Sequence, residues 1–204
     1  VYSLKEYEAF ENICDKIFSP DDVISLKRAI ATAQNCITAA YYSLFSDVAP
    51  DSPYLKAIIR LYRMGLALGD GSGRYNPDRF NTRAEACTLI TKMQGGETVN
   101  DFSCKDVSES TWFHAYVGYC VKNKIMDLQN GKFFPHDYII GIDALSAMLR
   151  ISGYTDFTSE DEIFEAASSI GLTDGIYKFD TSAPVSREKF AQLMYNTLKI
   201  QQRI

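Results

Sequence analysis

The chain has 204 residues, of which 46% are hydrophobic and 23% are charged, and its formal net charge is −5 at pH 7. This length allows one large domain or two small ones with a real hydrophobic core. The acidic balance argues against a broad nucleic-acid face, and no apolar run approaches the roughly 20 residues of a membrane span.

Residues 1–44 are predicted to form a helical extension. The pattern over 4–18 is that of an amphipathic helix, and Ser19 and Pro20 form a start signal for a second helix over 23–42. Acidic residues follow Pro20, but the alternating Asp/Asn pattern of a calcium loop is missing. We therefore expect a helical cap or hairpin that packs on the rest of the chain.

From residue 45 onward, a block occurs three times, at 45–97, 98–153 and 154–204. Each copy has the pattern of a helix, a turn and a second helix. A repeat of roughly fifty residues is a supersecondary unit that buries its apolar face against its neighbours. The sequence therefore predicts a mainly helical fold of three stacked helix–turn–helix units.

The register of the copies is counted from the end of each first helix. Ile142 follows Lys124 by the same number of positions as Arg83 follows Gly65, so Ile142 is aligned with Arg83. In the third copy Arg187 takes this place after a shorter turn. The alignment predicts a basic residue at the head of the second helix in the first and third copies only.

Two of these second helices have start signals. Thr82 and Ser186 lie at N-cap positions, where a hydroxyl oxygen accepts hydrogen bonds from the first-turn N–H groups. Glu85 lies three residues after Thr82, which is the spacing of a capping box. These signals predict helices that begin at Arg83 and Arg187.

The first copy contains Phe45-Ser-Asp-Val48, Gly65-Leu66, Gly73-Arg-Tyr-Asn-Pro77 and Thr82-Arg-Ala-Glu85 in this order. With these motifs the chain resembles the S-layer homology domain over residues 45–200, strongly in the first copy and more weakly in the second and third. The resemblance implies a mainly α, pseudo-threefold, three-pronged spindle of tandem motifs. It also implies non-catalytic anchoring of a bacterial surface protein to secondary cell-wall polysaccharide, often pyruvylated, through pockets between motifs.

The resemblance also implies which residues bind the ligand. Arg83 and Arg187 would bind the carboxylate of a pyruvylated sugar, because a guanidinium offers a bidentate fork and a helix N-terminus favours an anion. The alternative for either arginine is a surface charge or a structural ion pair. Trp112 matches an aromatic position of the family, but the apolar stripe that continues through Val117 and Cys120 favours a core role over a sugar contact. The other predicted ligand-binding residues lie in the turn and at the two helix starts: Gly69, Asp70, Thr82, Glu85 and Ser186.

Catalytic and metal-binding hypotheses find little support in the sequence. His114 and His136 have no recognised metal or nucleophile spacing to Cys104 or Cys120. The five cysteines contain no CxxC pair and predict no disulfide framework. The glycine-rich turn over 69–73 lacks the lysine of a phosphate loop. We therefore expect neither an enzyme nor a cofactor or metal.

The resemblance implies an extracellular protein of the bacterial cell surface or S-layer. Its expected partners are cell-wall polysaccharide and, as a second class, other surface-layer proteins. Val1 is not an initiator residue, so the missing signal peptide does not argue against secretion. The rival hypothesis is a degenerate module that serves as a protein-interaction or assembly scaffold without glycan binding. Ile142 and the short third turn favour this rival, whereas Arg83 and Arg187 favour glycan binding.

Overall fold

The computed structural model describes residues 24–28, 30 and 44–201. Residues 24–28 and 30 are helical. The helix predicted over 4–18, and the rest of the helix predicted over 23–42, lie outside the described residues. Contacts divide the chain into two units, Val1–Leu44 and Phe45–Ile204.

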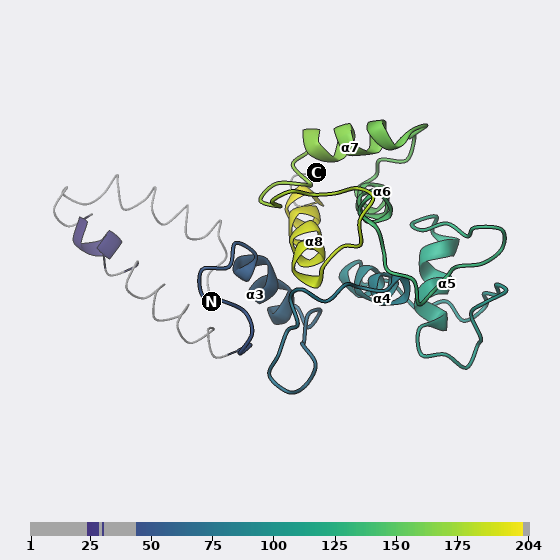
Figure 1. The fold of residues 1–204 in the computed structure, drawn as a ribbon, viewed down its shortest axis with the longest axis horizontal. Helices are drawn as coiled ribbons and strands as arrows, with labels where there is room; N and C mark the ends of the chain where they lie inside the picture. Colours follow the sequence, from purple (N-terminus) through teal and green to yellow (C-terminus); the bar gives the residue numbers. More distant parts are fainter. Residues whose placement is uncertain (1–23, 29, 31–43, 202–204) are drawn as a thin grey trace. The chain divides into compact units, whose positions relative to one another are not determined.

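The second unit is mainly helical, which confirms the predicted fold class (Figure 1). Extended segments in the described part of the chain meet only at isolated bridges and form no strand. No described helix is both long and apolar enough to cross a membrane. The helices of this unit are α3 (Leu55–Arg63), α4 (Arg83–Met93), α5 (His114–Lys122), α6 (Gly141–Ile151), α7 (Glu160–Ser169) and α8 (Arg187–Gln201).

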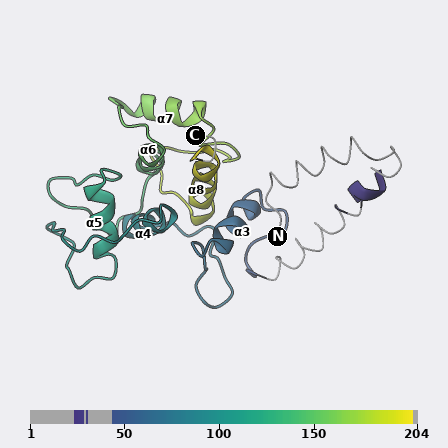
Figure 2. The same ribbon diagram turned by 180° about the vertical axis from the view of Figure 1, so that it is seen from behind.

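The helices pack in a cyclic order that crosses the boundaries of the copies. Helix α4 packs against α5, α6 packs against α7, and α8 packs back against α3. Figures 1 and 2 show α8 beside α3 from both sides. The second helix of each copy therefore packs against the first helix of the next copy, and no copy buries its apolar face alone.

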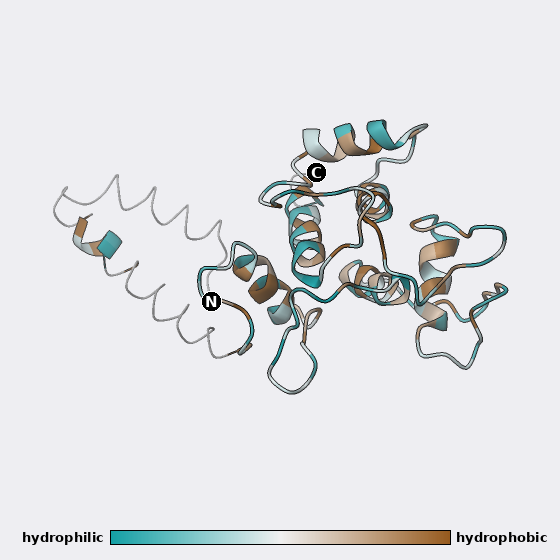
Figure 3. Ribbon diagram, viewed as in Figure 1, coloured by the Kyte–Doolittle hydropathy of each residue, from teal (hydrophilic) through white to brown (hydrophobic). Residues whose placement is uncertain are grey.

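The core lies between these helices. Figure 3 shows hydrophobic and hydrophilic residues together on α3 and α8, as expected for amphipathic helices with one buried face. The largest fully buried side chains come from all three copies and include Ile58, Leu61, Ile90, Phe133, Leu145, Met148, Phe190 and Leu193. Burial of each such side chain contributes about 1.5–3 kcal/mol relative to leaving it exposed.

The three copies meet at a closed ring of backbone hydrogen bonds. The N–H of Asn81 donates to the carbonyl oxygen of Val185 at 3.3 Å, and the N–H of Val185 donates to that of Ile139 at 2.9 Å. The N–H of Ile139 closes the ring by donating to the carbonyl oxygen of Asn81 at 3.0 Å. All three residues are buried. Because each copy contributes one residue, the ring shows which positions of the copies are equivalent.

This equivalence corrects the predicted register of the second copy. The N–H groups of Arg83, Gly141 and Arg187 each donate to a backbone carbonyl of the neighbouring copy, so Gly141 takes the place assigned to Ile142. The prediction assumed a constant turn length between the first and second copies, whereas the turn shortens from each copy to the next. A side chain at position 141 is also excluded, because a Cβ there would lie 2.3 Å from the carbonyl oxygen of Asp180.

Asp47 and Asp106 brace the turns of the first and second copies. The Asp47 carboxylate accepts hydrogen bonds from the two N–H groups of residues 75–76, both at 2.8 Å. The Asp106 carboxylate does the same for residues 133–134, again at 2.8 Å. Burial alone would raise the pKa of both carboxyls, but these hydrogen bonds outweigh it and lower the pKa.

We expect the free energy of unfolding to fall in acid. A carboxyl whose folded pKa lies below its unfolded value of about 3.9 stabilises the fold fully above that value, and the stabilisation is lost as the pH falls through the folded pKa. In Asp47→Asn the amide cannot accept both N–H bonds, so we expect a loss of about 1–2 kcal/mol at neutral pH. Denaturant unfolding between pH 2 and 7 should also show a shallower acid dependence, and an unchanged slope would contradict this role of Asp47.

Candidate functional site

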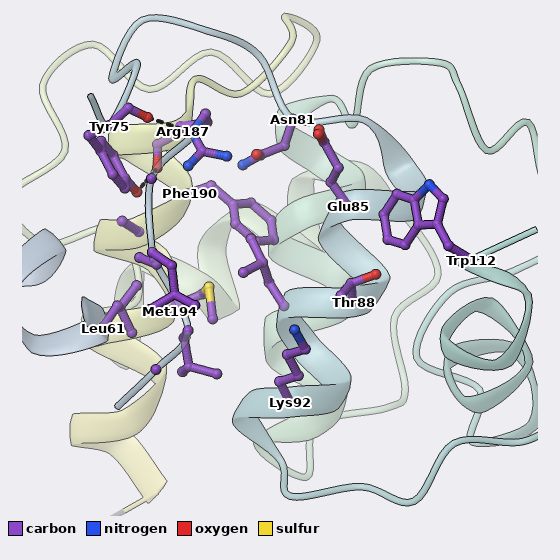
Figure 4. A pocket seen from close by; sticks show the side chains of 17 residues that line it. Leu61, Tyr75, Asn81, Glu85, Thr88, Lys92, Trp112, Arg187, Phe190 and Met194 are labelled. Atoms are coloured by element: carbon purple, nitrogen blue, oxygen red, sulfur yellow. Dashed lines mark hydrogen bonds between the residues drawn. The ribbon is translucent and has the colours of Figure 1, made fainter. Parts of the chain in front are cut away.

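A pocket of about 200 Å³ opens between α4, α8 and the loop that follows α3 (Figure 4). All three copies contribute to it, because Trp112 from the second copy completes the lining. Its polar and aromatic lining residues are Tyr75, Asn81, Glu85, Thr88, Lys92, Trp112, Arg187 and Phe190. Of the predicted ligand-binding residues, Gly69, Glu85, Trp112 and Arg187 lie here.

Arg187 is the first residue of α8 and is oriented by Tyr75. Its Nε donates to the Tyr75 carbonyl oxygen at 2.9 Å, and its guanidinium carbon lies 4.9 Å from the centroid of the Tyr75 ring. Burial raises the pKa of Tyr75 to about 12, so this phenol stays neutral at physiological pH. The two terminal nitrogens of Arg187 have no hydrogen-bond or ion-pair partner within residues 44–201. The guanidinium is therefore held through its Nε, while its two terminal nitrogens have no partner in this described range.

The start of α8 offers a ligand fewer free backbone N–H groups than the sequence predicts. The N–H of Arg187 donates to the carbonyl oxygen of Arg79 at 2.8 Å, and the N–H of Glu188 donates to that of Pro77 at 3.1 Å. These first-turn donors are thus already occupied by the neighbouring copy. The guanidinium, rather than free N–H groups, is what this helix start presents to an anion.

Glu85 lines the pocket, but its carboxylate is committed to the start of α4. It accepts a hydrogen bond from the N–H of Thr82 at 2.9 Å, while the Thr82 hydroxyl accepts from the N–H of Glu85 at 3.2 Å, which is the predicted capping box. Arg79 forms an ion pair with the same carboxylate. Burial alone would raise the pKa of Glu85, but Arg79 and Thr82 outweigh it and lower the pKa. The charge of Glu85 is therefore balanced by Arg79 and not by Arg187.

Trp112 lines the pocket on the side away from Arg187 (Figure 4). Its side chain is 63% exposed, so the core role that its sequence context favoured is wrong. It lies in the turn before α5, and its ring meets Phe113 edge-on at a centroid distance of 5.3 Å. An exposed indole is a rigid apolar surface with one polar tip, suited to contact with the face of a sugar ring.

The other predicted ligand residues shape the turn or cap helices. Gly69 lines the pocket at φ 75°, and a Cβ there would lie 2.5 Å from a backbone carbonyl oxygen, so only glycine fits. Asp70 lies outside the pocket lining, and hydrogen bonds from Ser72, Asn76 and the N–H of residue 74 lower its pKa. Thr82 and Ser186 lie at their helix starts, also outside the lining.

Arg83 holds the equivalent place at the start of α4, but its donors are used within the protein. Its Nε donates to the Phe133 carbonyl oxygen at 2.9 Å and its guanidinium carbon lies 4.9 Å from the Phe133 ring, the same arrangement as at Arg187. Its terminal nitrogens pair with Asp143 and donate to the carbonyl oxygen of Asp127 at 3.4 Å. Arg83 is 6% exposed and does not line the pocket. Its ligand role stays a prediction, and it would require Asp143 to give way.

The different state of the two arginines follows from two differences between the first and second copies. Asp143 takes the place of Glu85 but is one methylene shorter, and its helix has Ile140 at the N-cap with no side-chain cap. Without a capping box to complete, its carboxylate pairs with the arginine of the preceding copy. The third equivalent place holds Gly141, which has no side chain. Among these three places, only the one at Arg187 has a guanidinium without a carboxylate partner in the described part of the chain.

Four polar lining residues were not among the predicted ligand-binding residues: Tyr75, Asn81, Thr88 and Lys92. Asn81 is 1% exposed, and neither polar atom of its side chain has a hydrogen-bond partner within the described residues. Comparison of Asn81 with the equivalent residues of the other two copies is the sequence signal that identifies it. The ring partners Ile139 and Val185 are aliphatic, so the first copy alone places an amide at this buried position.

His114 and Cys120, which the sequence analysis considered for catalysis or metal binding, are buried in the core. His114 is buried, with its Nε2 2.8 Å from the Phe102 carbonyl oxygen. Cys87 of the first copy and Cys120 of the second copy are both buried, and the Cys120 Sγ lies 3.7 Å from the Cys87 carbonyl oxygen. Burial raises the pKa of the Cys87 thiol. No group of three or more His, Cys, Asp or Glu side chains that could hold a metal occurs in the described part of the chain.

Comparison with known proteins links this geometry to a family. The S-layer homology domain matches residues 44–87, which include α3, the turn and the start of α4. The chain is 29% identical over 139 residues to a cell surface protein of Thermoanaerobacter kivui, covering 65% of this chain and 18% of that protein. It is 26% identical over 189 residues to the middle cell wall protein of Brevibacillus brevis, covering 88% of this chain and 18% of that protein. It is 23% identical over 191 residues to the surface-layer 125 kDa protein of Lysinibacillus sphaericus, covering 84% of this chain and 16% of that protein.

The chain thus spans less than a fifth of the length of these relatives. Their names are those of surface-layer and cell-wall proteins rather than of enzymes. These matches confirm the predicted resemblance and the predicted extracellular, cell-surface location, and they support anchoring at the cell surface in general. The comparisons thus relate this chain to S-layer and cell-surface proteins, and the S-layer homology domain itself is matched over residues 44–87.

Proposed function

We propose that the pocket at Arg187 binds the carboxylate of a pyruvylated secondary cell-wall polysaccharide and so anchors the protein non-covalently to the wall. One observation carries this proposal. The guanidinium of Arg187 is held by Tyr75 as Arg83 is held by Phe133, and only Arg83 has a carboxylate on its remaining donors. The Asp143 carboxylate on Arg83 indicates the kind of group that would bind the terminal nitrogens of Arg187.

The charges around the pocket suit an anion. Arg187 and Lys92 contribute positive charge, and the negative charge of Glu85 is balanced by Arg79. Arg187 also stands at the positive end of a 15-residue helix dipole, which favours a negative ligand by about 0.3–1 kcal/mol. Trp112 adds an apolar surface for a sugar ring on the other side of the pocket. A saccharide with a ketal carboxylate meets both requirements.

A scaffold function without glycan binding is the second candidate. It is favoured by the state of the other two equivalent places, since Arg83 is paired with Asp143 and Gly141 has no side chain. A module under selection for glycan binding at every pocket would keep three free arginines. The two candidates differ in whether the protein needs the wall polymer.

The discriminating experiment is a pull-down with purified bacterial cell walls. One sample carries the pyruvylated polymer, a second is stripped of polymer, and a third carries the polymer after removal of its pyruvate. We expect retention on the first only, and release by soluble pyruvylated polymer. Equal retention on all three walls, or none on any, would support the scaffold function instead.

We expect Trp112→Ala to weaken polymer binding about 3- to 10-fold, the usual effect of losing an aromatic contact. Because the side chain is 63% exposed, the free energy of unfolding should change by less than about 0.5 kcal/mol. Isothermal titration with soluble polymer fragments and thermal unfolding measure the two effects. Tyr177→Ala is the matched control, since Tyr177 is 70% exposed and lies outside the pocket. Equal affinities of the two variants would exclude a sugar contact at Trp112.

A further inference from the structure

Asn81 places an unsatisfied amide in the lining of the pocket. The residue is 1% exposed, and both its Oδ1 and Nδ2 lack hydrogen-bond partners within the described residues. Figure 4 shows its side chain extending toward the guanidinium of Arg187. Most buried polar side chains in proteins are hydrogen-bonded, so an exception calls for an explanation.

The fold does not need an amide at this position. Asn81 contributes only its backbone to the ring that joins the three copies, and the equivalent residues Ile139 and Val185 contribute the same groups with aliphatic side chains. An aliphatic residue at position 81 would avoid the desolvation of the amide. The sequence thus keeps a locally unfavourable group at the pocket and at neither equivalent position. Local violations of this kind concentrate at functional sites.

We propose that Asn81 is a specificity-determining residue, whose amide hydrogen-bonds a neutral hydroxyl or amide group of the saccharide next to the carboxylate held by Arg187. This inference rests on the proposed function and concerns the same pocket. A guanidinium only donates hydrogen bonds, whereas a carboxamide both donates and accepts. Arg187 alone would accept any carboxylate. With Asn81 beside it, the pocket selects an acidic saccharide that carries a hydrogen-bond donor close to the acid group.

The selectivity follows from the cost of leaving the amide unpaired. A ligand that satisfies the amide recovers a hydrogen bond, whereas a carboxylate without the neighbouring polar group leaves the amide buried and unsatisfied. Sites built in this way reject analogues that lack the polar group far more strongly than apolar pockets do. The protein without ligand also contains the unpaired Asn81 amide, which lowers its free energy of unfolding. A change that improves stability at this position should therefore weaken binding.

The test is Asn81→Val, which copies the residue at the equivalent position 185. Titration with soluble pyruvylated polymer fragments should show about 10-fold weaker binding. Thermal unfolding without ligand should show a melting temperature raised by about 2–6 °C, because the unsatisfied amide is gone. A purely structural role for Asn81 would lower the melting temperature, and unchanged binding would likewise overturn the inference.

Two further variants separate this inference from the proposed function. Asn81→Asp keeps the size of the side chain but adds an anion beside Arg187 and removes the amide donor, so we expect a greater loss of binding than in Asn81→Val. Arg187→Gln tests the pocket itself in the same titration. If Arg187→Gln loses binding while Asn81→Val binds as the wild type does, the inference fails and the proposed function stands. If Arg187→Gln binds as the wild type does, the proposed function fails, and the inference fails with it.

Discussion

Arg187→Gln is expected to weaken binding of pyruvylated polymer at least about 100-fold, as loss of a charged group that pairs with a carboxylate in a partly buried site does. The free energy of unfolding should fall by only about 1 kcal/mol, because the side chain gives up one hydrogen bond, from its Nε to the Tyr75 carbonyl oxygen. Titration with soluble polymer and denaturant unfolding measure the two quantities on one preparation.

Arg83→Gln is the matched control, because Arg83 has the same backbone place and the same contact with a ring and carbonyl. Here we expect unchanged polymer affinity and a loss of about 2 kcal/mol of stability, since the variant breaks a buried pair whose Asp143 side is partly solvated. The structure thus distinguishes two arginines that the resemblance assigns to the same ligand role. Equal losses of affinity in the two variants would contradict the assignment of the pocket to Arg187.

The sequence predicts those parts of the fold that depend on residues close together in the chain. The capping box of Thr82 and Glu85 is present because its two hydrogen bonds depend on residues three positions apart. The amphipathic pattern likewise predicts α4 and α8 from short windows. The cyclic packing, in which α8 returns to α3, depends on residues far apart in the chain, and no local pattern encodes it.

The register of the second copy shows where counting fails. A constant interval from Lys124 leads to Ile142, but the backbone hydrogen bonds align Gly141 with Arg83. The turn between helices absorbs the difference in length because loops tolerate it at small entropic cost. The backbone ring identifies Ile139 and Val185 as the equivalents of Asn81, and their aliphatic side chains make its buried amide unusual.

The state of each arginine is decided by a residue of another copy. The sequence favours Arg83 over Arg187 because the first motif is the better preserved. In the structure Asp143 pairs with Arg83, whereas Glu85 pairs with Arg79, and Arg187 has no carboxylate partner among the residues described. A well-preserved motif indicates that its own copy folds as expected. Whether its arginine is available to a ligand depends on the carboxylate that faces it from another copy.

Asp143→Ala tests this dependence directly. We expect a loss of about 2–3 kcal/mol of stability, because the guanidinium of Arg83, which is 6% exposed, loses its only carboxylate partner among the described residues. Denaturant unfolding measures this loss. Asp127→Ala is the control, since its carboxylate pairs with Arg150 and is 67% exposed, and the Arg83–Asp143 pair stays intact. A similar loss in both variants would show that the Arg83 pair has no special weight.

The same variant should also change ligand binding. With Asp143 removed, Arg83 has no carboxylate partner among the described residues and keeps a terminal hydrogen bond to the Asp127 carbonyl oxygen, so titration with pyruvylated polymer fragments should detect a second, weaker site in addition to the first. Its ligand would restore part of the lost stability, because binding to the folded state alone raises the free energy of unfolding. Unchanged stoichiometry together with normal binding at Arg187 would mean that a free arginine is not sufficient. Trp112 and Asn81 would then be the further features that make the Arg187 pocket a binding site, because the residue equivalent to Asn81 in the second copy is the aliphatic Ile139.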